Sequence, residues 1–451
     1  MKIFARRARL EAGWENDVSV AIAEGVITEI ETGAAPSDDA TSVDTLLPAL
    51  GNLHSHSFQR AMAGLTEYRA RGRESFWTWR ELMYRFLDRL TPEHVQAIAA
   101  QTFVEMQKAG YASVGEFHYV HHQPGGVAYD NIAELSLRVI EAAKLTGIGL
   151  THLPVLYTYG GLGNLSLAGG QLRFGNGVDE FSNLVATAKH ALADLPGDAR
   201  IGIAPHSLRA TNPADLAQAL ENHPDGPIHI HISEQTKEVE DVSASMGARP
   251  VEWLLANAPV NERWCLIHAT HMTEAETVGF AKTGAVAGLC PITEANLGDG
   301  IFNGPTFLQS GGAFGVGSDS NVNISLTEEL RTLEYSQRLR DRERNVMLNG
   351  EGSTGEALYL GAALGSAQAL QRDAGRIAAG ALADLIAIDS TDLTLCALKD
   401  EQLLDGLVFA AKDNVVTDVW SAGRHQVQRG HHVAEADVAK AYRKAVAELT
   451  A

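Results

Sequence analysis

The chain has 451 residues, 45% of them hydrophobic and 20% charged, which is the composition of an ordinary globular protein with room for a second, smaller domain. Its formal net charge of −20 argues against nucleic acid and anionic membrane surfaces as partners. The three cysteines form no disulfide pattern, and neither a signal-peptide core nor an apolar run near the ~18 residues of a membrane span is apparent, so we expect a cytoplasmic protein.

Short β-strands are predicted at both ends of the chain. Residues 2–10 and 18–30 alternate apolar and polar side chains, and residues 383–389 and 416–430 have the same character. The middle of the chain differs, so we expect a small β-sandwich domain built from both ends beside a larger unit. The expected boundaries are 1–47 and 368–451 for the two parts of the small β domain and 48–367 for the large domain.

The large domain is predicted to be a (β/α)8 TIM-type barrel. Eight short apolar runs alternate with helical segments such as 92–110 and 133–147, the second of which ends at Gly147. This alternation is typical of parallel strands joined by helices, and eight units close a barrel. The runs span residues 46–56, 112–119, 147–157, 200–207, 227–233, 264–270, 285–291 and 313–319.

Five of the eight runs end in a residue that can bind a metal ion or move a proton. Because the active site of a TIM barrel lies at the carboxyl ends of its strands, we expect these side chains to meet there. They are His54, His56, His206, His231, His268 and Asp319.

The spacing of His54 and His56 suits a shared metal ion. Side chains at positions i and i+2 of a strand point the same way, so both imidazoles can face the barrel mouth. An isolated pair of this kind is weak evidence, but His231 and Asp319 at later strand ends strengthen it. Three histidines and one carboxylate leave room for a water, as a catalytic zinc requires. The fourth run has no lysine, which favours one metal ion over two.

Two further residues suggest proton handling. Glu234 follows His231 by three residues, so it can ferry a proton between water and a leaving nitrogen, or it can be a helix cap or a solvated side chain. His268 can be a ligand, a hydrogen-bond donor to the transition state, or structural. His229 shares a face with His231 one layer deeper, and we expect a hydrogen-bonded core histidine there. His271 is expected in a loop.

The order of these motifs resembles the amidohydrolase superfamily in its single-metal deaminase branch. LPALGNLHSH, HIHISEQ, LIHATH and GSDS carry the resemblance, and GRIAAGALADLIAID is similar to the start of that family's small β domain. A narrower set, NLHSHSFQRAMAGL, SFWTWRELMY, GEFHYVHH, HSLRA and CPITEANLGDGIF, is similar to formimidoylglutamate deiminases. These enzymes convert N-formimino-L-glutamate and water to N-formyl-L-glutamate and ammonia in histidine degradation.

The resemblance implies roles for particular residues, and it implies a homodimer. One zinc ion, or iron or another divalent metal, would be held by four residues and would activate a water to hydroxide. Asp319 would also accept a proton, Glu234 would pass one to the leaving nitrogen, and His268 would stabilise the tetrahedral centre. The implied ligands are His54, His56, His231 and Asp319, and the implied substrate contacts are Gln59, Arg80, Tyr119, His206 and Arg209.

The substrate's two carboxylates suit paired arginines, because a guanidinium forms forked hydrogen bonds with a carboxylate. Arg80 and Arg209 are the candidates, although either alone would more often be a surface ion pair. Asn321 departs from some relatives, and the path of residues 66–75 and the roles of His118, His121 and His122 stay open. The alternatives are a deaminase of a purine or related ring on the same fold, and a catalytically inactive barrel that serves as a binding protein.

Overall fold

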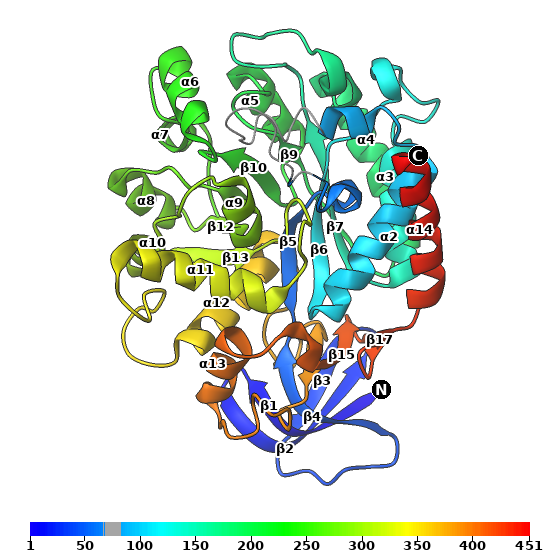
Figure 1. Ribbon diagram of the computed structural model, residues 1–451, viewed down its shortest axis with the longest axis vertical. Helices are drawn as coiled ribbons and strands as arrows, with labels where there is room; N and C mark the ends of the chain where they lie inside the picture. The colour runs from blue at the N-terminus through cyan, green and yellow to red at the C-terminus, as the bar shows by residue number, and fades with distance from the viewer. Residues whose placement is uncertain (66, 68–82) are drawn as a thin grey trace.

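The computed structural model of the chain describes residues 1–65, 67 and 83–451. Its larger unit consists of parallel strands surrounded by helices (Figure 1). The strands are β5 (Leu50–Ser55), β6 (Tyr111–His118), β7 (Gly149–Leu156), β8 (Arg200–Ile201), β9 (Ala204–Pro205), β10 (Ile228–Ile232), β11 (Trp264–His268), β12 (Val286–Leu289) and β13 (Ala313–Val316).

The short strands β8 and β9 both pair with β7 and together fill the fourth position of the ring. A parallel bridge from Ile203 to Ile228 joins this position to β10, and one from Ser55 to Asp319 joins β5 to the segment after β13. The predicted eight-position (β/α)8 barrel is therefore confirmed. The barrel strands read as near-continuous apolar runs because most are buried on both faces.

The first predicted run, 46–56, contains two strands. Its first residues end β4 (Ala40–Pro48), which belongs to the other sheet, and β5 begins at Leu50. Ala49 lies between them and donates its backbone N–H to the carbonyl oxygen of Asp384. Apolar periodicity cannot separate the two strands, because both are buried where they meet.

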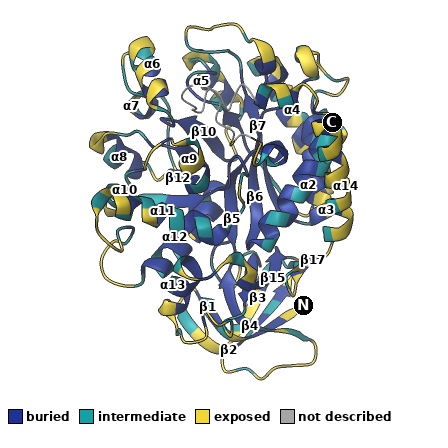
Figure 2. Ribbon diagram, in the orientation of Figure 1, coloured by how far each residue is buried: buried dark blue, intermediate teal, exposed yellow. Residues whose placement is uncertain are grey.

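The helices lie outside the strands, with their buried faces inward and their exposed faces outward (Figure 2). The expected helices are confirmed as α2 and α3, and Gly147 ends α3 with a left-handed φ of 67°. The helices are α2 (Pro92–Lys108), α3 (Glu134–Thr146), α4 (Val178–Ala191), α5 (Pro213–Asn222), α6 (Thr236–Met246), α7 (Pro250–Asn257), α8 (Glu274–Ala281), α9 (Pro291–Leu297), α10 (Gly304–Gln309), α11 (Leu326–Asp341), α12 (Thr354–Ala369), α13 (Glu401–Phe409) and α14 (Glu435–Thr450). No helix among the described residues is long and apolar enough to cross a membrane.

The smaller unit takes strands from both chain ends, as expected. They form one continuous eight-stranded sheet in the order β17-β16-β15-β14-β4-β1-β2-β3, in which β14 joins the two ends by pairing with β4. The remaining strands of this sheet are β1 (Lys2–Leu10), β2 (Gly13–Ala23), β3 (Val26–Glu31), β14 (Leu385–Ile388), β15 (Val416–Ser421), β16 (Arg424–Gln428) and β17 (His431–His432).

The last helix leaves this sheet and returns to the barrel. Figure 1 shows α14, in red, lying along α2. Lys108 Nζ lies 2.6 Å from Glu435 Oε1, and His94 Nε2 lies 3.0 Å from Glu448 Oε2, so ion pairs mark both ends of this contact. The final residues of the chain therefore cover the barrel rather than extend the sheet.

A buried ion-pair network joins the two units at the end of the barrel where the strands begin. Arg372, which is fully buried, lies 3.0 Å from Asp198 and 2.9 Å from Asp384. Arg424 of β16 adds a 2.7 Å contact to Asp198. Removing one partner would leave a buried charge unpaired, which typically costs about 3–5 kcal/mol.

Candidate active site

A cavity of ≈ 610 Å³ opens where the barrel strands end. Its wall brings together residues that are far apart in the sequence, as expected for the carboxyl face of a TIM barrel. All the predicted site residues that the structure describes, except the fully buried His54, line this cavity directly; Arg80 lies outside the described residues. The lining includes His56, Gln59, Tyr119, His206, Arg209, His231, Glu234, His268 and Asp319.

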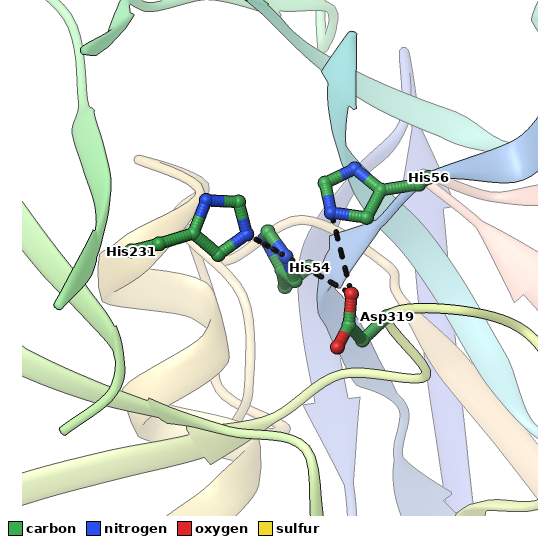
Figure 3. A group of neighbouring side chains, drawn as sticks. All are labelled: His54, His56, His231 and Asp319. Carbon is green, nitrogen blue, oxygen red and sulfur yellow. Dashed lines mark hydrogen bonds and ion pairs between the residues drawn. The ribbon is translucent and has the colours of Figure 1, made fainter. Parts of the chain in front are cut away.

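Four of these side chains form a group that can hold a metal ion. The ligand atoms of His54, His56, His231 and Asp319 all lie within 4.8 Å of one another (Figure 3). Asp319 Oδ1 lies 3.4 Å from His54 Nε2 and 3.3 Å from His56 Nε2, and the Nε2 atoms of His54 and His231 are 3.1 Å apart. A tetrahedron of ligands around zinc has edges of roughly 3.4 Å, given bonds of about 2.0–2.1 Å.

Hydrogen bonds from the imidazole rings of His56 and His231 determine which ring nitrogen of each faces the centre of this group. His56 donates from Nδ1 to the carbonyl oxygen of Phe117 at 2.9 Å, and His231 donates from Nδ1 to that of His206 at 3.1 Å. A neutral ring that donates from Nδ1 keeps a lone pair on Nε2. Burial lowers the pKa of all three histidines, that of His54 to about 3. Lone pairs that converge at these distances suit a cation between them, so the donor set fits a divalent metal.

The backbone around Asp319 holds the carboxylate against β5. The N–H of Asp319 donates to the carbonyl oxygen of His54, and the N–H of His56 donates to that of Asp319, each at 2.9 Å. Asn321, whose role the sequence left open, donates from Nδ2 to Ser55 Oγ and to the carbonyl oxygens of His56 and Asp319. Asn321 therefore ties the loop that carries one ligand to the strand that carries two others.

His268 and Glu234 lie beside this group. His268 Nε2 is 3.8 Å from Asp319 Oδ2 and 4.0 Å from Glu234 Oε1. Glu234 is 5% exposed, so the alternative of a solvated glutamate is wrong. The residue before it, Ser233, lies in the left-handed region at φ 52°. Helix α6 begins after Gln235 without a side-chain cap, so the helix-cap alternative is also wrong.

Burial and charge shift the acid–base properties of these groups. Burial raises the pKa of Glu234, so this carboxyl group holds a proton more readily than an exposed glutamate does. Burial alone would lower the pKa of His268, but the surrounding carboxylates, Glu234 foremost, raise it to about 10. Burial would raise the pKa of Asp319, yet its contacts with His54 and the other histidines hold it below its ordinary range. Groups with opposite shifts thus lie within 4.0 Å of one another, which is typical of catalytic sites.

The candidate substrate contacts line the cavity beside the metal-binding group and Glu234. Gln59 donates from Nε2 to the hydroxyl of Tyr119 at 2.6 Å, and the Tyr119 ring packs on His56. His206 packs on His231 with ring centres 4.9 Å apart. Arg209 Nη2 lies 3.9 Å from Glu234 Oε2, so a cation lies beside the proposed proton carrier.

The other histidines take the places expected of structural residues. His229 is fully buried, and its Nε2 donates to the carbonyl oxygen of Ala369 at 2.9 Å. His271 lies beyond β11 and donates from Nε2 to the carbonyl oxygen of Asp299. Three histidines to which the sequence assigned no role are buried at the end of β6 and just after it, and they are not among the described residues that line the cavity. This trio is His118, His121 and His122.

The sequence predicted no role for Tyr84, Tyr157 or the loop 160–163, which also line the cavity. It predicted none for Glu294, which is not among the described lining residues. Glu294 Oε1 lies 3.2 Å from His268 Nδ1. Its only sequence signal was its place in CPITEANLGDGIF, just after the strand that neighbours the His268 strand.

Comparisons with known proteins agree with this geometry. Residues 45–425 match the amidohydrolase family, and residues 1–41 match the N-terminal domain of the formimidoylglutamate deiminase HutF. The chain is 48% identical to a formimidoylglutamate deiminase of Pseudomonas aeruginosa over 450 residues, 99% of each protein. A solved amidohydrolase from Brucella melitensis superposes with a TM-score of 0.95 at 47% identity, with both chains fully covered. A 5-methylthioadenosine/S-adenosylhomocysteine deaminase of Natronomonas pharaonis is 26% identical over 430 residues, 91% of this chain and 88% of that protein.

Proposed function

The chain belongs to the amidohydrolase family, and we propose that it is a formimidoylglutamate deiminase, which hydrolyses N-formimino-L-glutamate to N-formyl-L-glutamate and ammonia in histidine degradation. The observation that carries the proposal is the 48% identity to the Pseudomonas enzyme along the whole chain, together with a matching acid–base site at the barrel mouth. The ring deaminases among the relatives are far more distant, at 26% identity or less, which disfavours a purine-type substrate.

We propose that the metal is one zinc ion per chain, held by His54, His56, His231 and Asp319. When bound, it would lower the pKa of a water molecule to ~7 and supply a hydroxide nucleophile. A cytoplasmic homodimer is proposed from the resemblance and from the commonness of two-fold dimers. We also propose a division into residues 1–47 and 368–451, the two parts of a small β domain, around a barrel of 48–367. The eight-stranded sheet supports this proposal, because its strands all lie before residue 49 or after residue 384.

The residues around the cavity can divide the proton transfers of the reaction. Asp319 accepts the proton of the attacking water. His268 points Nε2 at the same space and donates a hydrogen bond to the oxygen that has added to the tetrahedral centre. Glu234, whose raised pKa lets it carry a proton, delivers it to the nitrogen that leaves as ammonia. The departing nitrogen takes one proton from Glu234 and the one that Asp319 accepted from water, and Glu234 regains a proton from the hydroxyl group as the C=O bond forms. One water adds and one ammonia departs, so the atoms balance.

Removing the metal is the first test. Purified protein loaded with zinc is expected to release ammonia from N-formimino-L-glutamate, and a chelator-treated sample is expected to release none until zinc is restored. Chelation should also lower the Tm, because a ligand that binds only the folded state stabilises it. If a zinc-loaded, folded sample releases no ammonia, the substrate assignment is wrong, although the assignment of the fold still holds. Ammonia release that the chelator leaves unchanged would instead discard the metal.

Arg209 is proposed to hold a substrate carboxylate. Its side chain is 14% exposed and faces the cavity, and charge-assisted hydrogen bonds contribute about 1.5–3 kcal/mol each. Arg209→Ala is therefore expected to lower kcat/KM by about 100-fold, mainly through KM, while the metal content stays unchanged. Steady-state kinetics with N-formimino-L-glutamate measure this effect.

Lys237 offers a matched control, because it is a second cation on the wall of the same cavity. It is paired with Asp241 at 2.8 Å, and its side chain is 59% exposed. Lys237→Ala is expected to change kcat/KM by less than about threefold, as is typical when a surface ion pair is lost. Equal losses in the two variants would mean that general charge attraction, not a specific clamp, accounts for the effect of Arg209.

A further inference from the structure

Glu294 makes a contact behind the active site that the proposed reaction does not yet use. It lies on α9, the short helix that follows β12, and it is 5% exposed. Its Oε1 accepts hydrogen bonds from His268 Nδ1 at 3.2 Å and from the backbone N–H of Cys290 at 2.9 Å. Glu294 is not among the described residues that line the cavity, so it reaches the reaction only through the His268 ring.

The two nitrogens of His268 therefore face different partners. A carboxylate accepts hydrogen bonds, so Nδ1 carries the proton of this contact and Nε2 is turned to Asp319 and Glu234. Without Glu294, rotation about the Cβ–Cγ bond of His268 could exchange the positions of the two ring edges or tilt the ring. The backbone here also needs support from its surroundings, since His268 and Ala269 both lie in the left-handed region, at φ 68° and 47°.

Helix α9 is itself fixed, which makes Glu294 a rigid support. Glu329 of α11 accepts the backbone N–H of Ile292 at 2.9 Å, and Thr293 Oγ1 lies 2.9 Å from Ser320 Oγ, next to Asp319. The support for His268 and the loop that carries Asp319 are thus held together by the same short helix.

We propose that Glu294 is a positioning residue that fixes the His268 ring so that Nε2–H is aimed at the oxygen that adds to the formimino carbon. This inference rests on the proposed function for its catalytic consequence and on the geometry of the two contacts for its structural one. It separates the roles of three neighbouring carboxylates: Asp319 and Glu234 face the substrate, and Glu294 orients the imidazole between them.

The test compares Glu294→Ala and Glu294→Gln in the zinc-loaded full chain. We expect Glu294→Ala to lower kcat on the order of 10–100-fold, as the loss of an orienting partner of an active-site histidine typically does. KM should change by less than about threefold and the metal content should not change. Glu294→Gln keeps an acceptor oxygen and is expected to retain intermediate activity, which would be partial rescue by the conservative variant.

A double-variant cycle distinguishes positioning from a general structural effect. If Glu294 acts through His268, adding Glu294→Ala to His268→Ala should cost less than about threefold beyond the single variant, because the two effects are coupled. If Glu294→Ala lowers kcat by the same factor in the wild type and in His268→Ala, the proposal is wrong. Glu329→Gln is the matched control. Glu329 does not reach His268, and the amide oxygen of glutamine can still accept the backbone N–H of Ile292, so kcat should stay within about threefold of the wild type.

A spectroscopic measurement tests the same contact without turnover. The wild-type proton spectrum is expected to show a downfield ring N–H signal that is lost in His268→Ala and in Glu294→Ala. If the wild type fails to turn over N-formimino-L-glutamate, the proposed function fails, and this signal still decides whether Glu294 holds His268. Persistence of the signal in Glu294→Ala would overturn the positioning role whatever the substrate.

Discussion

Replacing Asp319 by asparagine is expected to lower kcat by at least about 10³-fold and to weaken metal binding. The carboxylate lies within 3.4 Å of the Nε2 atoms of His54 and His56, and it is proposed both to bind the metal and to accept a proton. The amide oxygen of asparagine is an uncharged, weaker metal ligand and is not basic enough to take a proton from water, and the loss of a positioned base alone typically costs ~10²–10⁴-fold in rate. Asparagine has nearly the same shape and tolerates the φ of 47° at this position, so the fold should survive.

The measurement is kcat together with metal content and Tm, and Asp299→Asn is the matched control. Asp299 is also buried near the site, but burial, together with the nearby Glu234, raises its pKa to about 8, so a neutral amide resembles the acid it replaces. Asp299→Asn should keep kcat within about threefold of the wild type. Asp319→Asn with normal metal content and more than a tenth of normal kcat would contradict both proposed roles of Asp319.

The barrel could be predicted from the sequence because its signal is local. Most strands are short buried runs, and five of the eight predicted runs end in a residue that can bind a metal ion or move a proton. The spacing of these residues can be read from the linear chain, as with His54 and His56 or His231 and Glu234. Because the signal is local, the predicted first run starts at residue 46, whereas β5 begins at Leu50. Between Leu47 and Leu50 the chain passes from one sheet to another, and both neighbours are apolar. Only the pairing of β14 with β4 distinguishes them.

The supports of the site could not be predicted, because they depend on tertiary contacts. Glu294 meets His268 across 26 positions, and Asn321 meets Ser55 across 266. A glutamate in a short helix and an asparagine after an aspartate have many ordinary explanations in a sequence. Their burial decides between these explanations, since a buried polar side chain requires a hydrogen-bond partner.

Backbone strain at the strand ends gives a physical reason for this dense support. Ser233, His268 and Asp319 have φ values of 52°, 68° and 47°, and each lies at or just past the end of a barrel strand. Non-glycine residues in this region cost of order 1–3 kcal/mol each and persist when their surroundings hold them. The hydrogen bonds of Glu238 to the N–H of Glu234, of Glu294 to His268 and of Asn321 to the Asp319 carbonyl supply such support.

Replacing Glu234 by glutamine is expected to lower kcat by ~10²–10⁴-fold while the metal content stays normal. Glutamine preserves the shape of this buried side chain and its reach to Arg209 and His268, but it cannot carry a proton to the leaving nitrogen. Glu234 is outside the group of metal-binding atoms, so a loss of metal would point to a structural effect instead. A variant that keeps more than about a third of normal turnover would rule out the proposed role.

Added formate makes this prediction specific for proton transfer. Glu234→Ala leaves a space where a small carboxylic acid can bind beside Arg209, whereas Glu234→Gln leaves that space filled. Formate is therefore expected to restore part of the turnover of Glu234→Ala in a concentration-dependent way and to leave Glu234→Gln unchanged. If formate helps neither variant although both keep their metal and fold, Glu234 acts by holding Arg209 and His268 in place. The proton would then have to reach the departing nitrogen from His268 or Asp319, the other acid–base groups beside it.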